Sequence, residues 1–273
     1  MSPTSTIAKV ALVATLAVCL PAQAYPTHTR MFRQHYARSV GCQLCHEVDD
    51  TQRNPFGEGW AKAGGTAAAF LAMEPLDSDG DGALDGAEIK AGSNPGKKTS
   101  TPESPGKFGL ATPSTFIPVE PLRHIFGDAR RIEASEVELS KDMISRAESR
   151  IGHPLDPSLR WLDLYFAVEE GRRTSVALFI YAETQKAKFV AIVGLDSRAR
   201  VLKSVVLSSG KLASGPYARY LSCFQGKAAA DLPAPSDCAP TDKQGLDGPT
   251  ALELRGKVRE ALETLSIALA RRT

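Results

Sequence analysis

The chain has 273 residues, enough for one small module and one full domain, and its 33 Lys and Arg nearly balance 31 Asp and Glu, for a formal net charge of +2. Because both signs of charge are mixed along the chain, neither a nucleic-acid partner nor an anionic membrane surface is indicated.

Residues 1–24 have the features of a secretory signal peptide: Lys9 precedes a short apolar run, and a small-x-small cleavage site ends at Ala24. That run is too short to span a bilayer, and no later segment is long and apolar enough to do so. A lipoprotein signal built on Cys19 is an alternative, with Val18 a poor residue before the lipidated cysteine. We expect a periplasmic protein.

Residues 25–92 are predicted to form a first, mainly helical module around the sequence Cys42-Gln43-Leu44-Cys45-His46. This is a C-x-x-C-H pattern, which is typical of c-type haem attachment. Two thiols three positions apart on one helical turn can each form a thioether to a haem vinyl group, and His46 can then supply the proximal imidazole to the iron. The alternatives are a disulfide switch and half a zinc site, and the zinc site lacks a second Cys/His pair at ligand spacing nearby.

The distal iron ligand is sought among the side chains near this pattern. The candidates are His35, His28, Met31 and Met73, or an open position. We favour His35, which lies close before the attachment site. Residues 58–73 are rich in alanine and predict a helix that covers one haem face, interrupted at two consecutive glycines.

Residues 77–88 fit the twelve-position EF-hand calcium loop. Gly82 permits the sharp turn at position 6, and Leu84 is expected to pack inward at position 8. The predicted ligands are the side chains of Asp77, Asp79, Asp81, Asp85 and Glu88 and the backbone carbonyl of Ala83. A solvated acidic loop without an ion is the alternative. Since only one loop is visible, we expect a structural calcium ion rather than a calcium switch.

Residues 93–114 are rich in Pro, Gly, Ser and Thr and predict a semi-rigid linker. Residues 115–273 predict an α+β domain with an antiparallel sheet, so the fold class of the whole chain is α+β. Ser135 and Glu138 match a capping box and predict a helix that extends to about residue 150. The remaining expected elements are strands at 161–168, 174–181, 188–195 and 201–207 and helices at 217–224 and 249–271.

Cleavage after Ala24 would leave four cysteines, of which two are assigned to haem. In an oxidising compartment the remaining pair, Cys223 and Cys238, is predicted to form a disulfide. The alternative is two free thiols.

The second unit resembles the FMN-binding domain of bacterial respiratory and extracytoplasmic flavoproteins. The resemblance rests on the order of elements and on the stretches 131–133, 191–201 and 220–227. In that family a Thr in a Ser-Gly-Ala-Thr stretch before the last helix holds FMN through a phosphoester. Here the stretch reads Asp247-Gly248-Pro249-Thr250, so the resemblance implies Thr250 as the attachment residue, with Asp and Pro replacing Ser and Ala. A helix start favours a phosphate, whereas an aspartate there favours an unliganded cap.

The first unit resembles small secreted monohaem cytochromes with an EF-hand-like loop, on the C-x-x-C-H pattern and the acidic loop. Two hypotheses follow. The protein is a periplasmic electron carrier with haem c, calcium and FMN, or its second domain lacks flavin and docks a partner redox complex. No catalytic triad, Gly-rich phosphate loop or convergent acid–base pair is visible in the sequence, which favours a redox subunit over an independent enzyme. We expect periplasmic or membrane redox partners.

Overall fold

The computed structural model describes residues 26–38, 40–47, 52–106, 117–210, 212–238 and 246–270. The predicted signal peptide lies outside these residues. Among the helices described, none combines the length and the apolar character that a membrane span requires.

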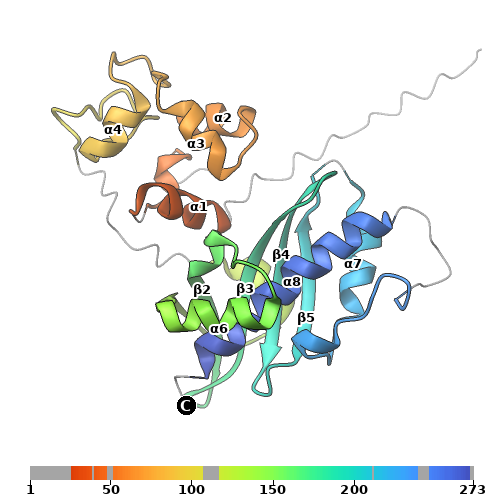
Figure 1. The fold of residues 1–273 in the computed structure, drawn as a ribbon. Coiled ribbons are helices and arrows are strands. Elements are labelled where there is room, and N and C mark those ends of the chain that lie inside the picture. The colour runs from red at the N-terminus through yellow and green to blue at the C-terminus, as the bar shows by residue number, and fades with distance from the viewer. Residues whose placement is uncertain are drawn as a thin grey trace, which may run out of the picture.

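The N-terminal unit is a cluster of short helices (Figure 1). Its elements are α1 (Pro26–Tyr36), the 3-10 turn η1 (Cys42–Leu44), α2 (Pro55–Lys62), α3 (Ala67–Met73) and α4 (Asp85–Ala91). The predicted interruption between α2 and α3 is confirmed, because Gly64 and Gly65 both take positive φ angles, 109° and 63°. Gly92 ends α4 in the left-handed conformation.

An apolar cluster fills the centre of this unit and is dominated by aromatic rings. Its buried members are Met31, Phe32, Val40, Leu44, Phe56, Trp60, Ala69, Phe70, Met73 and Ile89. The rings of Trp60 and Phe70 stack with centroids 5.3 Å apart, and Phe56 stacks on the same Phe70 ring. Cys45 packs against the cluster, so the C-x-x-C-H turn adjoins an apolar, aromatic-lined region.

The C-terminal unit is an antiparallel sheet with helices on it, and the predicted mixed α+β class is confirmed (Figure 1). Its strands follow the order β1-β2-β3-β4-β5. They are β1 (Arg131–Glu138), β2 (Trp161–Glu169), β3 (Arg172–Glu183), β4 (Lys188–Asp196) and β5 (Val201–Ser208). The helices are α5 (Val119–Phe126), α6 (Lys141–Ile151), α7 (Ser214–Ser222) and α8 (Gly248–Leu269), with the 3-10 turns η2 (Pro157–Arg160) and η3 (Ala229–Asp231).

The four strands expected from the sequence are confirmed, but the helix start predicted from the capping box at Ser135 and Glu138 is wrong. Residues 131–138 form strand β1, which pairs with β2 over its whole length, from Arg131 opposite Val168 to Glu138 opposite Trp161. The helix begins later, where Ser140 caps α6 by accepting a hydrogen bond from the Met143 amide at 3.3 Å. The pairing of β1 with β2, which follows it after a helix, outweighed the local helix-start pattern.

The two faces of the sheet have different cover. Helices α6, α7 and α8 pack over one face around the largest apolar core. On the other face α5 and α1 contact β3. Helix α5 approaches β4 so closely that a Cβ on Gly194 would lie 2.2 Å from the Cγ2 of Ile125, which is why this strand carries a glycine there. Helix α1 lies between the rest of the N-terminal unit and the sheet (Figure 1).

Residues 93–106, placed in the linker by composition, instead fold back on the N-terminal unit. Ser93, Asn94 and Ser100 are buried, and Ser100 accepts a hydrogen bond from the Asn94 amide at 2.9 Å. Residues 107–116 lie outside the described residues.

Candidate functional site

The C-x-x-C-H residues lie on one helical turn, as the spacing predicts. The amides of Cys45 and His46 both donate to the carbonyl of Cys42, at 3.2 and 3.0 Å. Burial raises the pKa of Cys45 to about 12 and also raises the pKa of Cys42. Redox-active C-x-x-C pairs depend on a lowered thiol pKa, so a disulfide switch fits these surroundings poorly.

A zinc site fits no better. Within the described part of the chain, the one group of three or more His, Cys, Asp or Glu side chains with ligand atoms close enough for a metal is in the acidic loop, at residues 77, 79 and 81. The two thiols therefore lack the further ligands that tetrahedral zinc requires. Two neutral thiols and a following imidazole beside an aromatic cluster fit covalent haem.

Asn54 holds the turn from the side of α2, and it was not singled out from the sequence. Its side-chain amide donates to the carbonyls of Gln43 and Leu44 at 3.2 and 2.9 Å. Its Oδ1 accepts from the Gly57 amide at 2.8 Å and so caps α2. The Asn-Pro pair before an apolar helix is the sequence signal for the cap. Nothing local indicates the bonds to the turn.

The histidine candidates for a distal ligand lie in different surroundings. His28 contacts the Trp60 ring edge-on at 5.0 Å between centroids, and burial, followed by the positive charges of His46 and Arg53, lowers its pKa to about 4. The Nε2 of His35 lies 3.6 Å from a carboxylate oxygen of Glu74. The electrostatic influence of His46 therefore reaches His28, while His35 lies beside the Glu74 carboxylate. Met31 and Met73 are both in the apolar cluster.

The first half of the predicted calcium loop brings three carboxylates together. Oxygen atoms of Asp77, Asp79 and Asp81 lie within 4.8 Å of one another. The loop turns through Gly82 at a φ of 99°, and the amide of that glycine donates to Asp77 at 3.0 Å. These contacts aim negative charge at one point, which is the arrangement a hard divalent cation requires.

In the second half of the loop, Asp85 and Leu84 differ from the loop pattern in what they contact. Asp85 is fully buried, and its two oxygens accept from the amide and hydroxyl of Ser78 at 2.9 and 2.6 Å, so it closes the loop. Burial raises the pKa of Asp85 to about 6. Leu84 is 50% exposed, which corrects the expectation that it packs inward.

Glu88 has a buried carboxylate oxygen without a partner among the described residues. It is fully buried, and its Oε1 accepts from the Ser93 hydroxyl at 3.1 Å. Its Oε2 and the Oδ2 atoms of Asp79 and Asp81 have no hydrogen-bond partner among the described residues. Burial raises the pKa of Glu88 to about 8, and the neighbouring carboxylates contribute to the rise. Unpaired buried carboxylate oxygens are costly, and a bound cation relieves the cost.

Thr250 does not fit a covalent flavin. It is 2% exposed, and both its amide and its hydroxyl donate to one oxygen of Asp247, at 3.1 and 2.5 Å. A hydrogen bond from Lys186 at 2.7 Å, together with those from Thr250, lowers the pKa of Asp247 to about 2. Asp247 is thus the charged N-cap of α8, and it opposes a phosphate at this helix start.

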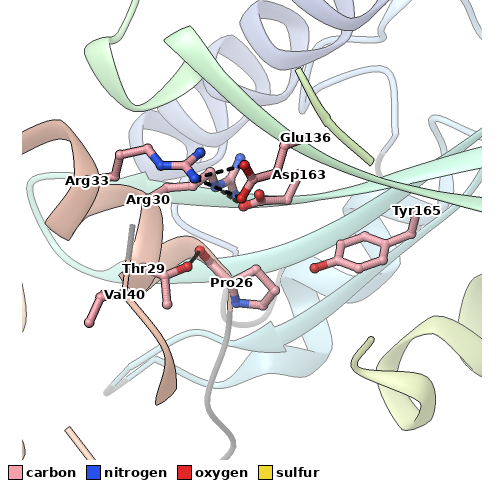
Figure 2. A pocket seen from close by; sticks show the side chains of 8 residues that line it. All are labelled: Pro26, Thr29, Arg30, Arg33, Val40, Glu136, Asp163 and Tyr165. Atoms are coloured by element: carbon pink, nitrogen blue, oxygen red, sulfur yellow. Dashed lines mark hydrogen bonds and ion pairs between the residues drawn. The ribbon is translucent and has the colours of Figure 1, made fainter. Parts of the chain in front are cut away.

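The N-terminal unit docks on the sheet through two arginines of α1, drawn in Figure 2. Arg30 is 4% exposed; its guanidinium donates to the Phe179 carbonyl of β3 and lies 3.5 Å from an oxygen of Asp163. The Nη2 atom of Arg33 donates to both carboxylate oxygens of Glu136 on β1, each at 2.8 Å. The two pairs join helix α1 to three strands.

The C-x-x-C-H turn lies close to this interface. Tyr165 of β2 lines a small cavity there together with residues of α1 and Val40 (Figure 2). Burial raises the pKa of Tyr165, and Cys42 is among the neighbours that contribute. Tyr181 of β3 packs against the apolar cluster of the N-terminal unit. Strands β2 and β3 of the sheet therefore lie beside the attachment turn.

Cys223 and Cys238 are brought together as free thiols. The Sγ of Cys223 lies 3.7 Å from the carbonyl oxygen of Cys238. Burial, with a contribution from Cys223, raises the pKa of Cys238 to about 12. The bridge is not formed in the structure, and the disulfide stays a prediction that this proximity permits.

Comparison with known proteins bears on the acidic loop alone. A model of the bacterial TSP3 repeat, a thrombospondin type-3 repeat, matches residues 77–98, which comprise the loop, α4 and the start of the following segment. No curated protein and no solved structure matches the chain. The match and the Asp77, Asp79 and Asp81 cluster together identify this segment as a candidate calcium site.

Proposed function

We propose that the protein is a periplasmic electron carrier with one haem c, attached through Cys42 and Cys45 and ligated by His46. The observation that carries the proposal is a C-x-x-C-H sequence on a single helical turn against an aromatic cluster. When bound, the haem supplies a one-electron redox centre. Phe56, Trp60 and the other cluster residues exclude water from that region, which influences the potential.

His28 is proposed as the second axial ligand, in place of the His35 favoured by sequence position. It supplies a neutral imidazole at pH 7, next to Trp60 and within the electrostatic influence of His46. His35 is held by Glu74. Two histidine ligands favour a lower potential than a His/Met pair.

Calcium is proposed to bind at Asp77, Asp79 and Asp81, with Glu88 contributing its unpaired oxygen. The backbone carbonyl of Ala83 is proposed as a further calcium ligand, on the loop pattern alone. Asp85 is proposed to support the loop through Ser78 rather than to ligate directly.

The C-terminal domain is proposed to be a docking module for redox proteins, without flavin. Two observations support this: the Thr250 hydroxyl is buried under Asp247, and one face of the sheet receives the haem module through Arg30 and Arg33. Partner redox complexes in the periplasm or membrane are the proposed electron donors and acceptors. The rival flavoprotein hypothesis predicts flavin absorbance in addition to haem absorbance.

The test is expression of the mature chain with the c-type haem maturation machinery. We expect a Soret band, haem that survives acid–acetone extraction, and no flavin released on denaturation. The double variant Cys42→Ala/Cys45→Ala should lose covalent haem, whereas the control Cys223→Ala/Cys238→Ala should retain it. Absence of a Soret band from the wild-type protein would refute the proposal.

Near-infrared magnetic circular dichroism tests the axial ligands. We expect a His/His spectrum that is lost in His28→Ala and retained in His35→Ala. The reverse pattern would restore His35 as the ligand.

A further inference from the structure

We propose that Asn94 is a positioning residue that couples the calcium loop to the haem-attachment turn. The inference rests on the proposed function, because it needs both the haem and the calcium ion. Asn94 lies in the segment after the loop, which its composition alone predicted to be a linker.

The coupling begins at Glu88. Its Oε1 accepts from the Ser93 hydroxyl at 3.1 Å, and its carbonyl accepts from the Ser93 amide at 2.9 Å. The left-handed Gly92 turns the chain back toward the loop at this point. Ser93 is fully buried, so its position follows that of Glu88.

The next residue, Asn94, is held on every side. Its amide donates to the Ser100 hydroxyl at 2.9 Å, and its Oδ1 accepts from the Gly96 amide at 3.0 Å. Its side-chain nitrogen donates to the carbonyl of Gln43 at 3.0 Å. Gln43 lies between the two haem cysteines, so this bond joins the segment after the calcium loop directly to the attachment turn.

The far end of the Asn94 turn also lies near a proposed calcium ligand. The amide of Lys97 donates to the carbonyl of Asn94 in the turn, at 3.0 Å, and it lies near enough to Asp79 to act on the pKa of that carboxyl, which burial raises. A cation that draws Glu88 and Asp79 together therefore acts on both ends of the turn that carries Asn94. Without it, unpaired carboxylates repel one another at both anchors.

Asn54 also holds the attachment turn, beside Asn94. It donates to the same Gln43 carbonyl at 3.2 Å and to Leu44 at 2.9 Å. Gly96 presses on it so closely that a Cβ at residue 96 would lie 2.3 Å from the Asn54 Cγ. Two asparagines thus bond the backbone between the cysteines, and one of them, Asn94, directly follows the Ser93 that bonds to Glu88 of the calcium loop.

The experiment is a calcium titration of the chelator-treated haem protein, followed by the visible spectrum and the midpoint potential, with calcium affinity measured by calorimetry. In the wild-type protein we expect both haem signals to shift with a half-saturation equal to the calorimetric dissociation constant. Asn94→Asp keeps the acceptor for Gly96 and loses the donor to Gln43. This variant should bind calcium and lose at least half of the shift. The control Thr101→Ala, in the same segment but bonded only locally to Ser104, should respond as the wild type does.

The outcomes separate the inference from the proposed function. Wild-type protein without haem, or without calcium binding, overturns the function and this inference with it. If the wild-type protein binds both haem and calcium but its haem signals do not change with calcium, the inference alone is overturned. The same holds if Asn94→Asp shows a shift as large as that of the wild type. If that variant does not fold, hydrogen exchange of the Cys45 and His46 amides in the wild type decides: calcium should slow it, and unchanged exchange overturns the coupling.

Discussion

Replacing Asp163 by alanine should weaken the docking of the N-terminal unit on the sheet. The change leaves the guanidinium of Arg30 buried, with 5% of its side chain exposed, while the other carboxylate that lines the cavity, Glu136, is paired with Arg33. Arginine does not lose its proton in a protein, so this cost cannot be relieved by neutralisation. The hydrogen bond to the Phe179 carbonyl remains.

The magnitude follows from the burial of the pair. Removing one partner of a buried ion pair costs about 3–5 kcal/mol. Since the Asp163 side chain is 18% exposed and a small cavity adjoins it, water can reach part of the site, and we expect about 2–4 kcal/mol. For a chain of this size that corresponds to a fall in melting temperature of roughly 5–15 °C.

The assay is urea denaturation of protein loaded with the proposed haem, with Soret absorbance reporting the N-terminal unit and far-ultraviolet circular dichroism reporting the sheet. The wild type should give coincident transitions, and Asp163→Ala should separate them. Glu136→Ala is the matched control, since the Arg33 and Glu136 side chains are 14% and 39% exposed and such a pair contributes only about 0.2–1 kcal/mol. Equal losses in the two variants would refute the reasoning.

Three further predictions concern other parts of the chain. Burial raises the pKa of Glu88 from its ordinary 4.5 to about 8, so the calcium-free folded state retains a proton that the unfolded state releases; its melting temperature should therefore fall between pH 5 and 8, and saturating calcium should remove that trend. An apo melting temperature that climbs over this range would contradict the burial argument. Under oxidising conditions Cys223 and Cys238 should form a bridge that stabilises the domain by about 3 kcal/mol, and labelling of both thiols in denatured, unreduced protein would exclude it. Gly194→Val should destabilise the protein by about 1–3 kcal/mol by displacing α5, whereas Gly256→Ala, in open space on α8, should be neutral or stabilising in the same thermal melts.

Several elements could be predicted because their causes are local. The C-x-x-C-H turn, the acidic loop through Gly82 and the break at Gly64 and Gly65 each depend on neighbouring residues. The four strands after residue 160 carry long apolar runs bounded by turn residues, and the sheet contains them. Strand β1 was missed because its few apolar residues, Ile132, Ala134 and Val137, do not alternate along its whole length, and its pairing with β2 decides its conformation.

Two motifs can be read directly from the sequence: paired thiols before a histidine, and carboxylates at the spacing of a calcium loop. Which distant residues lie beside these motifs depends on the fold. Asn94 contacts Gln43 across 51 residues and Arg30 contacts Phe179 across 149, and no local pattern announces either bond. The fold also gives His28 and His35, two turns apart on one helix, different neighbours: Trp60 lies against the first and Glu74 against the second. The physical reason is that a motif specifies its own ligands through spacing, whereas the groups that bury, orient and neutralise those ligands come from whichever segments the fold brings beside them.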